Sequence, residues 1–298
     1  MIALRLFDLH CDTLYECNKR GCNLDNKSLH IHLDAAQGFE SYTQCFGMFV
    51  PDTLRGEAAV MHINRLLSCL KRQKELFPDF FRYCQPILTV EGGAALGGKL
   101  ENINWLRENG VRAITLTWNG ENELAGGVMS DAGFSDFGKK AVGQMEKCGI
   151  IADVSHLNER SFYELCAFAG QPFIATHSAS KTICGNRRNL TDEQFLQIRE
   201  RGGIVGIVMC DKFLRDGENA GFEDILKHVD HFLSLGGENT LAFGSDFDGT
   251  DMPDGIVNIS SLFSLYEFLL KRGISEAQLD KIFYLNAHDF FEKHGGLS

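Results

Sequence analysis

The chain has 298 residues, which suffices for one large domain or for two domains of ordinary size. Its hydrophobic content of 44% and its charged content of 23% are typical of a globular protein, and they exclude disorder and fibrous structure. The formal net charge is −11, from 29 Lys and Arg against 40 Asp and Glu, and no basic stripe is present. We therefore expect neither a nucleic acid nor a membrane as a partner.

Short apolar runs alternate with segments of helical character along the chain, and eight of the runs are predicted strands. The strands span Leu4–Asp12, Thr43–Val50, Ile87–Glu91, Ala113–Trp118, Ile150–His156, Phe173–His177, Gly203–Val208 and Leu241–Asp246. The helices between them span Gly56–Phe77, Leu100–Asn109, Asp136–Cys148, Glu159–Ala169, Asp192–Arg201 and Phe222–Leu235. Three more helices follow the eighth strand, at Ser260–Lys271, Glu276–Phe283 and Ala287–Lys293.

Eight strands that alternate with helices indicate a (β/α)8 TIM-type barrel in the α/β class. An open, doubly wound sheet is the alternative, although no Gly-x-Gly-x-x-Gly motif follows the first strand. The chain has only five prolines and no linker-like stretch, so a single domain is expected over residues 1–298.

Ten cysteines are scattered along the chain without a Cys-x-x-Cys pair, which excludes a zinc ribbon or a thioredoxin-like motif. We expect reduced thiols rather than five disulfides, because neither a signal peptide nor another feature marks the chain as secreted. No apolar run approaches the 18 residues of a membrane span. A cytoplasmic location is therefore expected, and a homodimer is left open.

Polar side chains that could bind a metal gather at the ends of five predicted strands, where barrel enzymes carry their chemistry. These residues are His10 and Asp12, Glu91, His156, His177 and Asp246. Histidine, aspartate and glutamate are ligands of zinc-like divalent metals, and no cysteine joins them. Two metal sites could be filled with Glu91 as the bridge, which would leave Asp246 as an acid–base group.

Other histidines are expected to have no part in such a site. His30 and His32 have the spacing of a two-histidine motif but do not follow an apolar strand. His62, His228 and His231 lie on predicted helices, and we expect them on solvated faces.

Several motifs together resemble the membrane (renal) dipeptidase family, in the same order and with approximately the same spacing. They are His10-x-Asp12, Glu91-Gly-Gly, Thr115-Leu-Thr117, Val154-Ser-His156, His177-Ser-Ala, Arg187-Arg-Asn189 and Gly244-Ser-Asp-Phe-Asp-Gly249. The resemblance covers essentially the whole chain. It implies a metal-dependent, amidohydrolase-type barrel that hydrolyses dipeptides, often with a D residue at the C-terminal side.

The resemblance also implies a role for each matching residue. His10 and Asp12 would bind one zinc ion, His156 and His177 would bind the second, and Glu91 would bridge the two. Asp246 would shuttle the proton, and Arg188 would bind the substrate carboxylate. Asp8 could orient a ligand from behind His10.

One position departs from the family pattern. Many members have a histidine after the Thr-Leu-Thr motif, whereas this chain has Trp118 followed by Asn119. Trp118 could be a core residue or a pocket wall. The donor to the scissile carbonyl oxygen could be Trp118, Asn119, Asn122 or a zinc ion, so Trp118 and Asn119 are candidate substrate-binding residues.

The expected activity is therefore hydrolysis of dipeptides by a hydroxide shared between two zinc ions. The alternatives are an amidohydrolase acting on another small anionic amide or lactone, and a catalytically silent barrel that binds a metal or a ligand.

Overall fold

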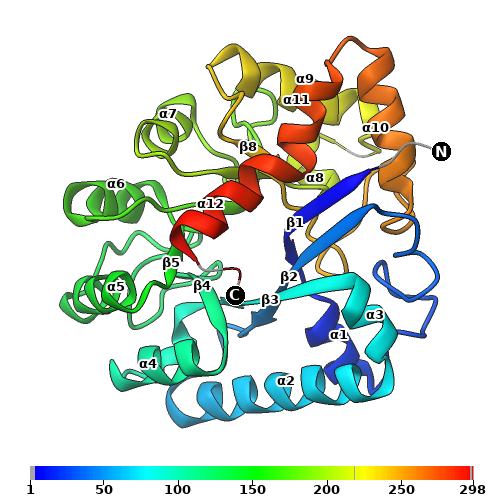
Figure 1. Ribbon diagram of the computed structural model, residues 1–298. Coiled ribbons are helices and arrows are strands. Elements are labelled where there is room, and N and C mark those ends of the chain that lie inside the picture. Colours follow the sequence, from blue (N-terminus) through cyan, green and yellow to red (C-terminus); the bar gives the residue numbers. More distant parts are fainter. Residues whose placement is uncertain (1–3, 218, 296, 298) are drawn as a thin grey trace.

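A computed structural model describes residues 4–217, 219–295 and 297. It contains a single sheet of eight parallel strands, in the order β5-β4-β3-β2-β1-β8-β7-β6 (Figure 1). The strands are β1 (Arg5–Cys11), β2 (Ser41–Phe49), β3 (Cys84–Glu91), β4 (Val111–Thr115), β5 (Ile151–Asp153), β6 (Ala175–Ser178), β7 (Val205–Ile207) and β8 (Leu241–Phe243). All eight strands lie at the predicted places in the chain.

The two end strands of this order meet and close the sheet into a barrel. Asp153 of β5 forms a parallel bridge with Ile174, the residue before β6. The N–H of Val154 donates to the carbonyl of Ile174 at 2.7 Å, and the N–H of Ile174 donates to the carbonyl of Ala152 at 3.0 Å. The predicted (β/α)8 barrel is therefore confirmed, and the open doubly wound sheet is wrong.

Helices surround the strands (Figure 1). They are α1 (Thr13–Arg20), α2 (Gly56–Leu76), α3 (Pro78–Tyr83), α4 (Glu101–Glu108), α5 (Asp136–Cys148), α6 (Glu159–Phe168), α7 (Asp192–Glu200), α8 (Asp211–Leu214), α9 (Phe222–Ser234), α10 (Ser261–Lys271), α11 (Glu276–Asp280) and α12 (Asn286–His294), with the short turns η1 (Gly93–Leu96) and η2 (Lys281–Leu285). Helices α1, α3 and α8, of eight, six and four residues, were not predicted.

The barrel is filled by an inner cluster of small, aliphatic and aromatic side chains. Six of the eight strands, and the residues that lead into β6 and β7, contribute to it. Phe290 and Phe291 of α12 complete the cluster, and Figure 1 shows α12 crossing the ends where the strands begin. That end of the barrel is closed, so only the opposite end can admit a ligand.

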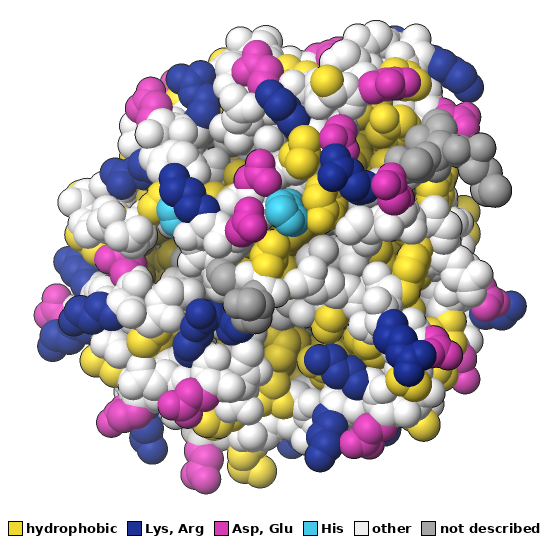
Figure 2. All heavy atoms as spheres, viewed as in Figure 1, with side chains coloured by type: hydrophobic (Ala, Val, Ile, Leu, Met, Phe, Trp, Pro, Cys, Tyr) yellow, Lys and Arg dark blue, Asp and Glu magenta, His cyan; other side chains and the backbone are white. Residues whose placement is uncertain are grey.

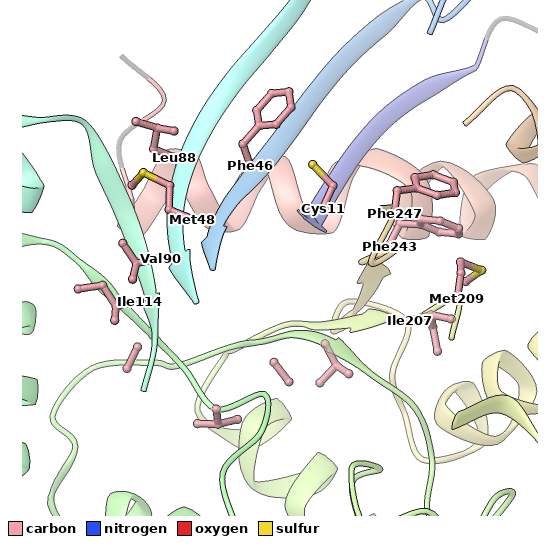
Figure 3. Packing of buried hydrophobic residues seen from close by; sticks show 14 of the residues in the cluster. Cys11, Phe46, Met48, Leu88, Val90, Ile114, Ile207, Met209, Phe243 and Phe247 are labelled. Carbon is pink, nitrogen blue, oxygen red and sulfur yellow. The ribbon is translucent and has the colours of Figure 1, made fainter. Parts of the chain in front are cut away.

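A larger, outer cluster packs between the strands and the helices (Figure 3). Phe46 and Met48 of β2 and Leu88 and Val90 of β3 belong to it, two residues apart on each strand. This alternation directs the residues between them, such as Gly47, into the barrel.

Strand β1 breaks that alternation just before the site. Leu6 and Cys11 belong to the outer cluster, whereas Phe7 and Leu9 belong to the inner one. The register of β1 against β2 shifts between Asp8 and Cys11, which marks a bulge. Bulges re-aim side chains, and this one turns His10 toward the barrel interior.

The surface on the α12 side carries acidic and basic side chains interspersed, without a patch of one sign (Figure 2). None of the helices in the described part of the chain combines the length and the apolar character that crossing a membrane requires. All ten cysteines lie in this part and are free thiols.

Candidate metal centre and active site

The five predicted metal ligands converge at the open end of the barrel. Glu91, the last residue of β3, divides its two carboxylate oxygens between them. Its Oε2 lies 3.5 Å from Nε2 of His10, and its Oε1 lies 2.8 Å from Nε2 of His156 and 3.8 Å from Nε2 of His177. Two ligand groups share Glu91, His10–Asp12–Glu91 and Glu91–His156–His177, each with its ligand atoms within 4.8 Å of one another. A third group of the same kind, His10–His177–Asp246, overlaps both.

Neighbouring side chains orient both histidines of the second group. Nδ1 of His156 lies 2.9 Å from Oδ1 of Asn119, and Nδ1 of His177 lies 2.9 Å from Oγ1 of Thr176. The Thr176 hydroxyl donates to Asp153 at 2.6 Å, so its oxygen accepts the Nδ1–H of His177. Both Nδ1 atoms therefore carry the proton, and both Nε2 atoms offer a lone pair to the site.

Two buried polar atoms that could bind a metal ion have no hydrogen-bond partner within the described protein. Nε2 of His10 and Oδ1 of Asp12 are both buried and unpaired. Asp12 occupies the N-cap position of α1, yet its side chain makes no capping hydrogen bond. Buried polar atoms are almost always satisfied, so these atoms fit divalent metal ions as their partners.

The electrostatics of the site also favour bound cations. Burial alone would lower the pKa of His10, but the carboxylates of Glu91, Asp12 and Asp246 raise it to about 10. Burial, helped by the charge of Arg188, lowers the pKa of His156 to about 4. The acidic side of the site thus holds a proton on His10, which a bound cation would displace, while His156 stays neutral and can bind a metal directly.

Asp246 lies beside the ligands in a strained backbone conformation. Its φ angle is 63°, and that of His156 is 73°, in the left-handed region that non-glycine residues seldom adopt. Burial raises the pKa of Asp246 to about 7. A Cβ atom at Gly249 would overlap the carboxylates of Asp12 and Asp246, so glycine is required there.

Arg188 is buried without an acidic partner. It is only 6% exposed, its Nε is unpaired, and no described carboxylate lies within ion-pairing distance. Nη2 donates to the carbonyl of His177 at 3.3 Å, and the guanidinium carbon lies 5.3 Å from the ring centre of Phe213. A buried guanidinium of this kind needs an anion.

A cavity of about 480 Å³ opens above these residues and is bordered by Asp12, Glu91, His156, Arg188 and Asp246. Trp118 and Asn119 also line it and remain candidates for contact with a ligand. Asn122 is not available. Its amide nitrogen donates to Leu116, and its Oδ1 accepts the backbone N–H of Leu124 and of Ala125.

The structure corrects several sequence-based expectations. His62 and His228 are buried, not solvated, and His231 is half-buried and pairs with Asp192. Asp8 does not contact the ring of His10. Its carboxylate accepts hydrogen bonds from Ser245 and from Gln44, because the bulge in β1 separates it from the ligand face.

Two residues around the site were not identified from the sequence. Thr176 orients His177, and Phe213 packs on Arg188. Asp248 belongs to the Gly244–Gly249 motif that the sequence displays. It accepts the Thr13 hydroxyl at 2.6 Å and the backbone N–H of His30 at 2.6 Å, which ties the first and last strand loops together.

Comparisons with known proteins show the family and the fold that this chain shares. A family model described as "Membrane dipeptidase (Peptidase family M19)" matches residues 1–293. The crystal structure of a family M19 dipeptidase superimposes with a TM-score of 0.91 at 25% identity, and the match covers 99% of this chain and 100% of that one. A Rhodobacter sphaeroides metallopeptidase, solved with a phosphinate mimic of L-Ala-D-Ala, shares the fold with a TM-score of 0.90 at 23% identity, covering 98% and 100% of the two chains.

A relative from Klebsiella pneumoniae, an uncharacterized protein in the pqqA 5′ region, is 32% identical over 209 residues. The match covers 66% of this chain and 77% of that protein.

Proposed function

Because this chain belongs to the membrane dipeptidase family, peptidase family M19, we propose that it is a binuclear zinc dipeptidase. The observation that carries the proposal is a pair of ligand groups that share Glu91 and lie in one cavity with the unpaired, buried Arg188. His10 and Asp12 would hold one ion, His156 and His177 would hold the other, and Glu91 would contact both.

When bound, the metal ions supply an activated water nucleophile and polarise the scissile carbonyl. The protein positions the substrate through Arg188, whose planar guanidinium can bind both oxygens of a terminal carboxylate. Trp118 and Asn119 border the same cavity and can donate to the carbonyl oxygen.

Asp246 is the proposed proton carrier. A carboxyl group whose pKa is about 7 is suited to accept a proton from the nucleophile near neutral pH and to release it again. It would deliver that proton to the leaving amine, so the peptide bond breaks into a free carboxylate and a free amine. Its left-handed backbone holds the carboxylate beside His10, with Oδ1 3.8 Å from Nε2.

The proposed substrates are dipeptides with a free C-terminal carboxylate, including those with a D residue at that end. The phosphinate mimic of L-Ala-D-Ala bound by the Rhodobacter sphaeroides relative supports the second part. We also propose a cytoplasmic location, which the acidic net charge and the ten unpaired thiols favour.

The test incubates zinc-loaded protein with libraries of L,L and L,D dipeptides and measures the release of free amine. We expect cleavage of dipeptides and none of tripeptides. Cleavage of lactones or N-acyl amino acids in place of dipeptides would move the assignment to another amidohydrolase activity.

A further inference from the structure

The cavity has an apolar wall on the side away from Arg188. It consists of three rings: Tyr15 of α1, Phe49 at the end of β2, and Trp118 after β4. The centres of the Tyr15 and Phe49 rings lie 5.0 Å apart, and those of Phe49 and Trp118 also lie 5.0 Å apart, both pairs edge to face. All three side chains are only half-buried, so the wall exposes continuous apolar surface to the cavity.

The wall is held in place by contacts outside the metal site. Nε2 of His62 on α2 lies 2.8 Å from the carbonyl oxygen of Phe49. The loop after Trp118 folds back, since the N–H of Met129 donates to the Asn119 carbonyl at 2.7 Å and that of Val128 donates to the His156 carbonyl at 2.9 Å. Val128 and Met129 thereby extend the wall along the cavity. A preformed apolar surface of this kind can bind a ligand without the entropic cost of ordering its own side chains.

The three rings of the wall carry no charge, and the nearest cation on the Tyr15 side is paired. Lys19 pairs with Glu16 at 2.9 Å, and its ammonium lies 5.4 Å from the ring centre of Tyr15. Arg187, whose guanidinium contacts Sδ of Met129, is the charged group at the other end of the wall. The surface between these two ends is apolar, which favours an apolar occupant there.

The strand order places Phe49 across the barrel from Arg188, whereas Trp118 lies two strands from β6 around the ring. Arg188 follows β6 and Phe213 follows β7, whereas Phe49 and Trp118 follow β2 and β4. In the closed ring of strands, β6 and β7 lie opposite β2 and β3. Asp12, Glu91 and His156 border the same cavity between the two sides.

This arrangement orients a dipeptide whose carboxylate is bound by Arg188. Its scissile carbonyl then lies over the ligand groups, and the residue before that carbonyl continues toward Phe49 and Trp118. We propose that the aromatic wall binds the side chain of the N-terminal residue, so that the enzyme selects dipeptides with a large apolar or aromatic residue at that position. This inference rests on the proposed dipeptidase function.

The expected size of the selection follows from burial of apolar surface. Transferring a leucine or phenylalanine side chain from water to an apolar wall favours binding by about 10-fold to 100-fold over glycine. The C-terminal residue lies on the Arg188 side, away from the wall, so its side chain should change kcat/KM much less.

The test compares kcat/KM for two dipeptide series on the zinc-loaded enzyme. In X-Ala, X is Gly, Ala, Leu, Phe or Glu, and in Ala-X the same residues occupy the second position. We expect Leu and Phe to exceed Gly and Glu at least 10-fold in the first series only. A flat first series, or a preference for Glu, would overturn the inference and leave the dipeptidase function standing, whereas absence of hydrolysis in both series would overturn the function itself.

Variants of the two tryptophans supply a second measurement. Trp118→Ala should flatten the X-Ala series, while Trp105→Phe, on α4 and outside the cavity, should keep it. Trp105→Phe also leaves Trp118 as the sole tryptophan, whose fluorescence should shift with a phosphinate analogue of Phe-Ala more than with one of Gly-Ala. Equal fluorescence shifts with the two analogues would contradict a contact between Trp118 and the N-terminal side chain.

Discussion

The Nε2 atoms of His156 and His177 lie only 2.9 Å apart, and Oε1 of Glu91 lies 2.8 Å from the first of them. Because Asn119 and Thr176 bind the Nδ1–H groups, both Nε2 atoms present lone pairs, and a carboxylate oxygen faces them. Lone pairs and negative charge that converge in this way are stable around a cation.

Glu91 should control the binding of both ions. We expect wild-type protein to bind close to two zinc ions per chain, and Glu91→Ala to lose both, because its two oxygens serve the two ligand groups. Metal analysis after dialysis measures the stoichiometry. Glu159→Ala, which removes an exposed carboxylate outside the cavity, is the control and should retain both ions. A single ion in fully loaded wild type would contradict the binuclear centre.

The substitution Asp246→Asn should abolish proton transfer while preserving the shape of the side chain. We expect kcat to fall by about 10²–10⁴-fold, the usual contribution of general acid–base catalysis. Zinc content should remain near that of wild type, because Asp246 is not needed for either of the two ligand groups that share Glu91. Activity and metal content are measured on the same preparation. Undiminished kcat would exclude Asp246 as the proton carrier.

Arg188 should decide whether the enzyme requires a free carboxylate. Arg188→Ala and Arg188→Lys should each lower kcat/KM for dipeptides by about 10-fold to 150-fold, because a charge-assisted contact is lost and lysine cannot form two parallel hydrogen bonds. Wild type should discriminate against dipeptide amides, and the alanine variant should do so less. Arg215→Ala, an exposed arginine near Phe213, is the matched control. Equal cleavage of dipeptides and their amides by wild type would argue against the clamp.

His228 should make stability depend on pH. Its Nδ1 accepts the N–H of Ser180 at 3.0 Å, and its Nε2–H donates to the Leu214 carbonyl at 2.9 Å, so a second proton has no acceptor. Burial lowers the pKa of His228 to about 4, whereas an unfolded histidine titrates near 6.5. Between these values the unfolded chain binds the additional proton, so the free energy of unfolding falls as pH falls, by up to about 3 kcal/mol.

Urea unfolding of wild type and of His228→Gln, at several values between pH 4 and 7, measures this dependence. Glutamine can offer one acceptor and one donor without titrating, so the difference between the two proteins should shrink toward pH 4. His288→Gln on α12 is the control and should follow wild type throughout. Parallel curves for wild type and His228→Gln would show that His228 does not titrate in this window.

The sequence by itself determined the order of the eight strands, and it singled out the candidate metal ligands that the fold brings together. Local signals suffice for these features, since apolar alternation and helix caps act over a few residues. A capping box from Thr191 to Gln194 begins α7, and α5 has the predicted bounds Asp136–Cys148. The ligands were visible because barrel strands end at one rim, so residues far apart in the chain meet there.

Strand ends were less well predicted at the site itself. The predicted strands reached His156 and Asp246, but β5 ends at Asp153 and β8 ends at Phe243. The left-handed φ angles of His156 and Asp246 are incompatible with a strand, and contacts from other loops impose them.

Only the tertiary structure decided which face of β1 carries His10 and which arginine is buried. The bulge that turns His10 inward arises from pairing with β2, more than 30 residues away in the chain. Arg188 becomes buried because Phe213, from the next strand loop, packs on its guanidinium. His228 is buried by two loops for the same reason. Contacts between distant segments, which no local pattern encodes, determine side-chain burial and orientation, and these set the chemistry of the site.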